Sequence, residues 1–219
     1  MSLTYAIGDI HGSLDKLERL MLQCEQDAAG QPSTFVFLGD YIDRGPDSAG
    51  VIAYLIEMQR RFGDRVITLK GNHEAMAVGA IDGEAPLRMW FVGGGEATLE
   101  SYGGIPPGEL PHEHVEWLRS LRLSHDDGRR LFVHAGIDPE QPLTAQVEAV
   151  LLWIREPFLS HTGDYGRLVV HGHTPQLTGA PDLRSNRLNI DTAAVFGGPL
   201  TAAVFDDTQA PPVRILQAW

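Results

Sequence analysis

The sequence of 219 residues is poor in cysteine, in basic side chains and in long apolar segments. Its single cysteine, Cys24, cannot form an internal disulfide, which excludes the small disulfide-stabilised scaffolds. The longest apolar stretch, around residues 149–154, is far shorter than the about 20 residues that span a membrane, so we expect no membrane partner. No basic or apolar leader precedes the first apolar run, and we therefore expect a cytoplasmic location.

The charge is strongly negative, with 17 basic against 29 acidic residues and a formal net charge of −12. Nucleic-acid binding depends on basic side chains that displace counterions from phosphates, so we expect no nucleic-acid partner. The hydrophobic content of 43% is enough to fill the core of one domain of this length. We therefore expect a single domain over residues 1–219.

Five short motifs rich in glycine, aspartate and histidine follow one another along the chain. Apolar runs at residues 3–7, 35–38 and 66–69 precede the first three, which places their polar residues just beyond the ends of buried strands, where open α/β sheets bind ligands. The motifs are Gly8-Asp9-Ile10-His11-Gly12, Gly39-Asp40-Tyr41-Ile42-Asp43-Arg44-Gly45, Gly71-Asn72-His73-Glu74, His134-Ala135-Gly136 and Gly172-His173-Thr174.

The side chains of these motifs offer oxygen and nitrogen donors but no thiolate. Such a set suits Mn²⁺, Fe or Zn²⁺ better than a soft metal or an iron–sulfur cluster. Two divalent cations would outweigh the carboxylates that hold them, so the site can attract phosphate in spite of the negative net charge. The motifs together indicate a two-metal site.

In their residues and order, the five motifs resemble the phosphoprotein phosphatase branch of the calcineurin-like metallophosphoesterases, in particular its small bacterial and bacteriophage members. The resemblance runs from Gly8 to about Phe205. It implies two divalent ions, Mn²⁺ first with Fe or Zn²⁺ as alternatives, and hydrolysis by direct attack of a metal-bridging water. It also implies the ligands: Asp9 and His11 for the first metal, Asp40 as the bridge, and Asn72, His134 and His173 for the second.

The same resemblance implies catalytic roles for residues beside the ligands. His73 would protonate the leaving oxygen, Asp43 would orient His73, and Arg44 would bind the phosphoryl oxygens. A carboxylate-held histidine and a two-pronged guanidinium suit these tasks on chemical grounds. The Trp153-Ile154-Arg155-Glu156 step resembles a Trp-x-Arg-Glu step of the bacterial branch, so Arg155 is the expected second arginine, with Arg167 in reserve.

The hydrophobic spacing predicts an α/β order for the rest of the fold. Leucines from residue 14 to 20 and apolar residues from 51 to 56 recur at helical spacing between the first three strands, which predicts parallel strands with crossover helices. Further strands are expected near residues 130–133, 167–170, 188–190, 200–205 and 213–216. The middle is less regular apart from a helix at 96–102, and we expect a cap-like region at about 80–128. The predicted fold is a sandwich of two mixed β-sheets flanked by helices.

The sequence leaves three functions open. The first is a serine/threonine protein phosphatase with a phosphoprotein or small phosphorylated substrate, and the second is a symmetrical dinucleoside tetraphosphate hydrolase. The third, a catalytically inactive binding module, is opposed by the intact motif set. Relatives of the bacterial branch commonly carry Asn at Val92, which bears on substrate preference more than on catalysis, and Gly at Ala193, where one methyl is added near a sheet turn. The role of His171 and the oligomeric state stay open.

Overall fold

The first sheet of the computed structural model, which describes residues 2–219, carries the three strands expected at the start of the chain. Its order is β10-β9-β1-β2-β3, with β1, β2 and β3 parallel and with β9 and β10 antiparallel to their neighbours. Leu3 pairs with Ser33 and Phe35 with Val66 in its register. The strands are β1 (Leu3–Ile7), β2 (Ser33–Phe37), β3 (Val66–Thr68), β9 (Leu200–Phe205) and β10 (Arg214–Ala218).

The second sheet is also mixed and has the order β4-β5-β6-β8-β7. Strands β5, β6 and β8 are parallel, while the two edge strands run antiparallel to their neighbours. The sequence predicted the three central strands but missed the short edge strands. The members are β4 (Ser124–Asp126), β5 (Arg130–Val133), β6 (Leu168–His171), β7 (Asp182–Leu183) and β8 (Arg187–Asn189).

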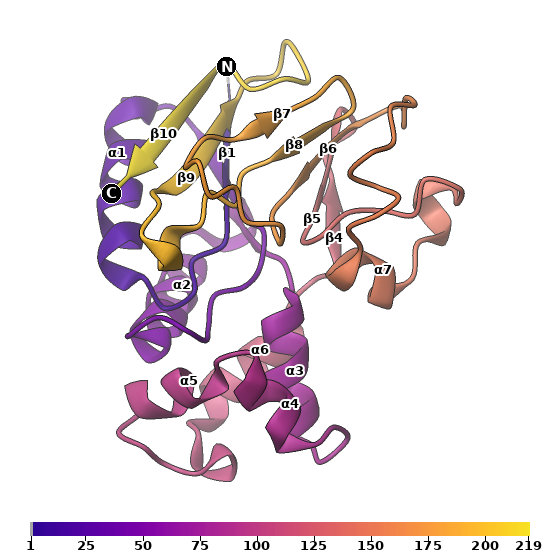
Figure 1. Ribbon diagram of the computed structural model, residues 1–219. Coiled ribbons are helices and arrows are strands. Elements are labelled where there is room, and N and C mark those ends of the chain that lie inside the picture. The colour runs from indigo at the N-terminus through magenta and orange to yellow at the C-terminus, as the bar shows by residue number, and fades with distance from the viewer. Residues whose placement is uncertain (1) are drawn as a thin grey trace.

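An apolar layer joins the two sheets, which lie beside each other in Figure 1. Val36 and Leu38 from the first sheet pack in one buried cluster with Phe132, Val170 and Leu188 from the second. Parallel strands that are buried on both faces consist of consecutive hydrophobic residues, which explains the apolar runs found in the sequence before the first three motifs. The predicted sandwich of two mixed sheets flanked by helices is confirmed.

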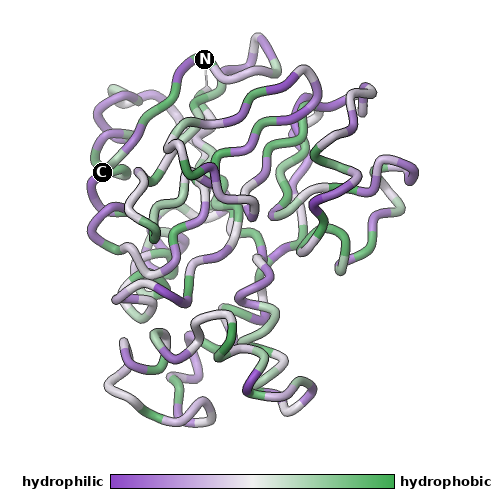
Figure 2. The backbone as a smooth tube through the Cα atoms, viewed as in Figure 1, coloured by the Kyte–Doolittle hydropathy of each residue, from purple (hydrophilic) through white to green (hydrophobic). Residues whose placement is uncertain are grey.

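Helices α1 (Leu14–Ala28) and α2 (Ser48–Phe62) cover the outer face of the first sheet. Leu17, Leu20 and Cys24 of α1 are fully buried in the large cluster on that face, while Figure 2 shows hydrophilic residues alternating along the outside of the helix. Asp47 begins α2 by accepting a hydrogen bond from the Gly50 N–H at 2.7 Å, which satisfies one of the free donors of the first turn.

The middle of the chain is more helical than its glycine and proline content predicts. Its helices pack into one group below the sheets in Figure 1, and tertiary contacts of Trp90 and Trp117 hold them where local propensity is weak. The helix expected at 96–102 is α5 (Gly95–Ser101), and three others were missed: α3 (Asn72–Ile81), α4 (Leu87–Val92) and α6 (His112–Ser120).

Short helices complete the described chain. The helix α7 (Glu148–Trp153) follows the second sheet's first parallel strand, and the 3-10 turns are η1 (Gly63–Arg65), η2 (Pro107–Glu109), η3 (Leu143–Ala145) and η4 (Ala194–Phe196). Between residues 2 and 219, no helix combines the length and apolar character needed to cross a membrane.

Candidate metal centre

The six expected metal ligands come together where the parallel strands of both sheets end. Asp9 follows β1, Asp40 follows β2, and Asn72 opens α3 just beyond β3. From the other sheet, His134 follows β5 and His173 follows β6. The carboxyl ends of parallel strands meet at one edge, so residues more than 160 positions apart in sequence, such as Asp9 and His173, become neighbours.

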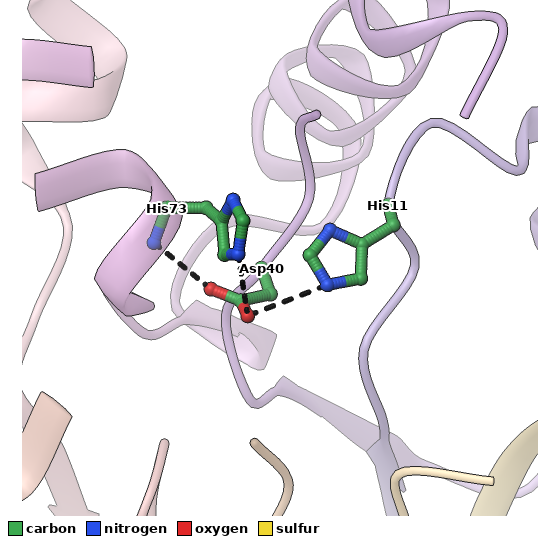
Figure 3. Close-up of side chains that lie close together, drawn as sticks. All are labelled: His11, Asp40 and His73. Carbon is green, nitrogen blue, oxygen red and sulfur yellow. Dashed lines mark hydrogen bonds and ion pairs between the residues drawn. The ribbon is translucent and has the colours of Figure 1, made fainter. Parts of the chain in front are cut away.

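Asp40 lies at the centre of this group. Its Oδ2 lies 3.5 Å from Nε2 of His11 and 3.9 Å from Nε2 of His73, and its Oδ1 lies 3.4 Å from Nε2 of His134. Figure 3 shows the rings of His11 and His73 on either side of the carboxylate. The carboxylate also faces His11 through Oδ2 and His134 through Oδ1, so it lies between expected ligands of the two different metals.

On the side away from His11, lone pairs converge without an obvious proton between them. The carbonyl of Leu38 can only accept, so Nδ1 of His134, 2.9 Å away, carries a proton and donates it. Burial lowers the pKa of His134, which keeps the ring neutral and leaves a lone pair on Nε2. That lone pair lies 2.9 Å from Oδ1 of Asn72, which is also an acceptor.

A cation fits this arrangement better than hydrogen bonding does. His173 approaches the same Asn72 Oδ1 through Nδ1 at 2.9 Å, and its buried Nε2 has no hydrogen-bond partner. Burial, and next the Asp191 carboxylate, raise the pKa of Asp9 well above its usual range, because the acidic groups repel one another. Two groups, His11-Asp40-His73 and Asp40-His134-His173, have ligand atoms close enough to hold an ion.

Backbone strain concentrates at the site. Seven non-glycine residues of the described chain have a positive φ, and five of them are expected site residues. Such conformations persist only where the surrounding structure enforces them, and they cluster at functional sites. Gly172 has a different constraint, since a Cβ there would collide with Oδ1 of Asp9. The five are His11, Asp40, Asp43, Arg44 and His173.

His73 and Asp43 form a buried pair beside the metal ligands. Nδ1 of His73 lies 2.6 Å from Oδ2 of Asp43, and the Nε1 of Trp90 and the hydroxyl of Thr98 also donate to that carboxylate. Burial works against the charged imidazole, but Asp40 and Asp43 outweigh it and raise the pKa of His73. The other ring nitrogen, Nε2, lies 3.9 Å from Oδ2 of Asp40, and His73 lines the cavity above the centre.

Glu74 holds the loop that carries Asp40. Its Oε2 accepts from the N–H groups of Asp40 at 2.9 Å and Gly71 at 2.8 Å, and its Oε1 accepts from Tyr41 at 2.8 Å and Ile42 at 3.3 Å. These four hydrogen bonds give Glu74 a structural role in its loop. The carboxylate ties the ends of β2 and β3 together.

Arg44 and Arg155 both line a pocket of about 340 Å³ above the centre. Arg44 also donates to Nε2 of His11 at 2.8 Å. Arg167 lies elsewhere, paired with Asp126 at 3.1 Å, and is not among the pocket residues. The arginine expected first, Arg155, is therefore the one that the fold brings to the site.

Several residues of the site were not expected from the sequence. Asp191, after β8, is buried and lines the pocket, and burial raises its pKa to about 7. Phe196 reaches the pocket from η4, and no local pattern signals it. Trp90 is buried and donates to Asp43. His171 is buried against Phe158 and does not line the pocket.

Comparisons with known proteins agree with this geometry. The serine/threonine-protein phosphatase 1 of Salmonella typhimurium is 32% identical over 91% of this chain and 90% of its own length. A symmetrical bis(5'-nucleosyl)-tetraphosphatase of Dechloromonas aromatica is 33% identical over 63% of this chain, and the match spans 45% of that protein. A solved structure assigned provisionally as a diadenosine tetraphosphatase has a TM-score of 0.72 at 21% identity, covering 99% of this chain and 94% of its own.

The family model of the calcineurin-like phosphoesterases matches residues 3–198, a range that includes all five motifs. This family uses a dinuclear divalent metal site, and the buried aspartates and histidines described above are groups that can hold such metals. The chain belongs to the calcineurin-like phosphoesterase family and is a metal-dependent phosphoester hydrolase.

Proposed function

We propose that this enzyme is a protein phosphatase of the serine/threonine type that hydrolyses phosphomonoesters. The observation that carries the proposal is the charge of the pocket. Arg44 and Arg155 are the basic side chains that line it, while Asp9, Asp40 and Asp191 are acidic. Two guanidinium groups, beside the charge of the bound cations, match the oxygens of one phosphoryl group. The match to the serine/threonine-protein phosphatase also spans 90% of that protein, against 45% for the symmetrical tetraphosphatase.

The residues would divide the reaction among them. Asp9, His11 and Asp40 would hold one metal, and Asp40, Asn72, His134 and His173 the other, with Mn²⁺ proposed because the donors are oxygen and nitrogen. When bound, the two ions would supply charge neutralisation and an activated water. The guanidinium groups of Arg44 and Arg155 would orient the phosphoryl oxygens.

His73 would then donate its proton from Nε2 to the leaving oxygen. Asp43 fixes the opposite nitrogen, at 2.6 Å, so the ring cannot turn away from the pocket. Trp90 and Thr98 in turn donate hydrogen bonds to Asp43, so buried side chains hold the carboxylate that orients His73.

The experiment compares phosphoserine peptides with diadenosine tetraphosphate under the same conditions, with Mn²⁺ added. We expect a higher kcat/KM on the peptides, because the pocket matches one phosphoryl group. The symmetrical tetraphosphatase is the second candidate function, favoured by the likeness of the chain to such enzymes. Hydrolysis of the dinucleotide with little activity on peptides would establish that candidate instead.

A further inference from the structure

Exposed apolar side chains surround the mouth of the pocket. Met89 and Val92 stand on α4, Trp153 ends α7 and Phe196 lies on η4; we call these four residues the apolar rim. Their exposed fractions are 54%, 88%, 48% and 58% in that order. Single exposed apolar residues are normal, but four that share one pocket mark a place where a ligand is removed from water.

The apolar rim begins directly above the groups that would bind phosphate. The ring of Trp153 lies edge-on to His173 with 6.1 Å between ring centroids. The Phe196 ring lies 5.6 Å from the guanidinium carbon of Arg44. The part of a substrate next to its phosphoryl group must therefore pass between these side chains.

Phe196 is held in place by a turn with its own supports. Nζ of Lys16, on α1, donates to the carbonyls of Ala194 at 2.9 Å and Gly198 at 2.7 Å. Ala193 has a φ of 61°, a conformation that favours glycine and that these contacts stabilise. The exposed ring of Phe196 therefore lies on a turn that is fixed at both ends, so its position at the pocket is set before a ligand binds.

Building on the proposed protein phosphatase function, we propose that the apolar rim binds an apolar side chain next to the phosphorylated residue of a peptide. Phe196 and Val92 are then specificity-determining residues. An apolar neighbour is removed from water together with the rim, whereas a polar neighbour must give up its hydration without a partner there. A contact of this size discriminates by roughly tenfold, the lower end of what an apolar pocket achieves.

The test uses two phosphoserine peptides that differ only in the residues flanking phosphoserine, leucine in one and serine in the other. We expect a kcat/KM for the leucine peptide roughly tenfold above that for the serine peptide. Phe196→Ala and Val92→Asn should each raise KM for the leucine peptide more than KM for the serine peptide, so that the preference falls. Phe196→Leu should preserve it, and Leu22→Ala, an exposed apolar change on α1 outside the pocket, is the matched control.

The possible outcomes distinguish a failure of the inference about the apolar rim from a failure of the proposed phosphatase function. Equal values for the two peptides, or a preference that survives both Phe196→Ala and Val92→Asn, would overturn the inference while the phosphatase activity stands. Failure on both peptides together with hydrolysis of diadenosine tetraphosphate would overturn the proposed function and the inference with it.

Discussion

Replacing Glu74 by glutamine should damage both stability and metal binding, although the side chain keeps its size. Both carboxylate oxygens accept from two backbone N–H groups each, and all four donors are buried. An amide presents one oxygen and one NH₂, so two N–H groups lose their acceptor. An unsatisfied buried donor costs about 1–3 kcal/mol, so we expect a loss of about 2–6 kcal/mol in the free energy of unfolding.

The loss should extend to the metal centre because the contacts fix Asp40. Its backbone N–H donates to Oε2 of Glu74, and its φ of 54° needs support from neighbouring groups. We therefore expect Glu74→Gln to bind Mn²⁺ more weakly as well as to unfold at lower urea concentration.

The assay is urea unfolding of the chelator-treated protein, followed by Mn²⁺ titration of the folded form. Glu148→Gln is the matched control, because Glu148 is an exposed partner of Lys70 whose ion pair contributes at most about 1 kcal/mol. A loss for Glu74→Gln as small as for this control, with unchanged metal affinity, would refute the assignment of four hydrogen bonds to the carboxylate.

Three further predictions concern the metals, the acid and stability at low pH. Hydrolysis of p-nitrophenyl phosphate should stop on chelation, and Asp40→Asn should lose metal and activity together; elemental analysis showing two retained metals with near-normal turnover would reassign the bridge. His73→Asn should keep its metals and slow turnover by roughly 10²- to 10⁴-fold, with a larger loss on phosphoserine peptide than on p-nitrophenyl phosphate. Asp43→Asn should show the same pattern with a smaller loss. An equal loss on both substrates would count against His73 as the acid. Hydrogen bonds from Arg214 lower the pKa of Asp27. The stability that this pair contributes should therefore be complete above the usual carboxyl pKa of about 4 and should be lost as the pH falls through the lowered pKa. Arg214→Gln should weaken this pH dependence of the free energy of unfolding, measured by urea unfolding.

The strand ends and the polar residues that follow them were accessible from the sequence because their signals are local. A buried parallel strand is a short apolar run, and a sharp turn after it needs glycine beside the polar residue, as at Gly8-Asp9 and Gly39-Asp40. Two of the missed helices, α4 and α6, are short and weak in propensity, and their tryptophans pack against distant elements, which no local window contains.

The sequence by itself determined the two-sheet α/β class and the set of residues that meet at the strand ends, because hydrophobic period and turn chemistry act between near neighbours. The tertiary structure decided what surrounds them: Asp191 beside Asp9, Trp90 on Asp43, and Phe196 over Arg44. Each of these pairs joins residues at least 47 positions apart. Such contacts depend on how the layers pack, and packing follows from the shape of the whole core, which no short stretch of the chain contains.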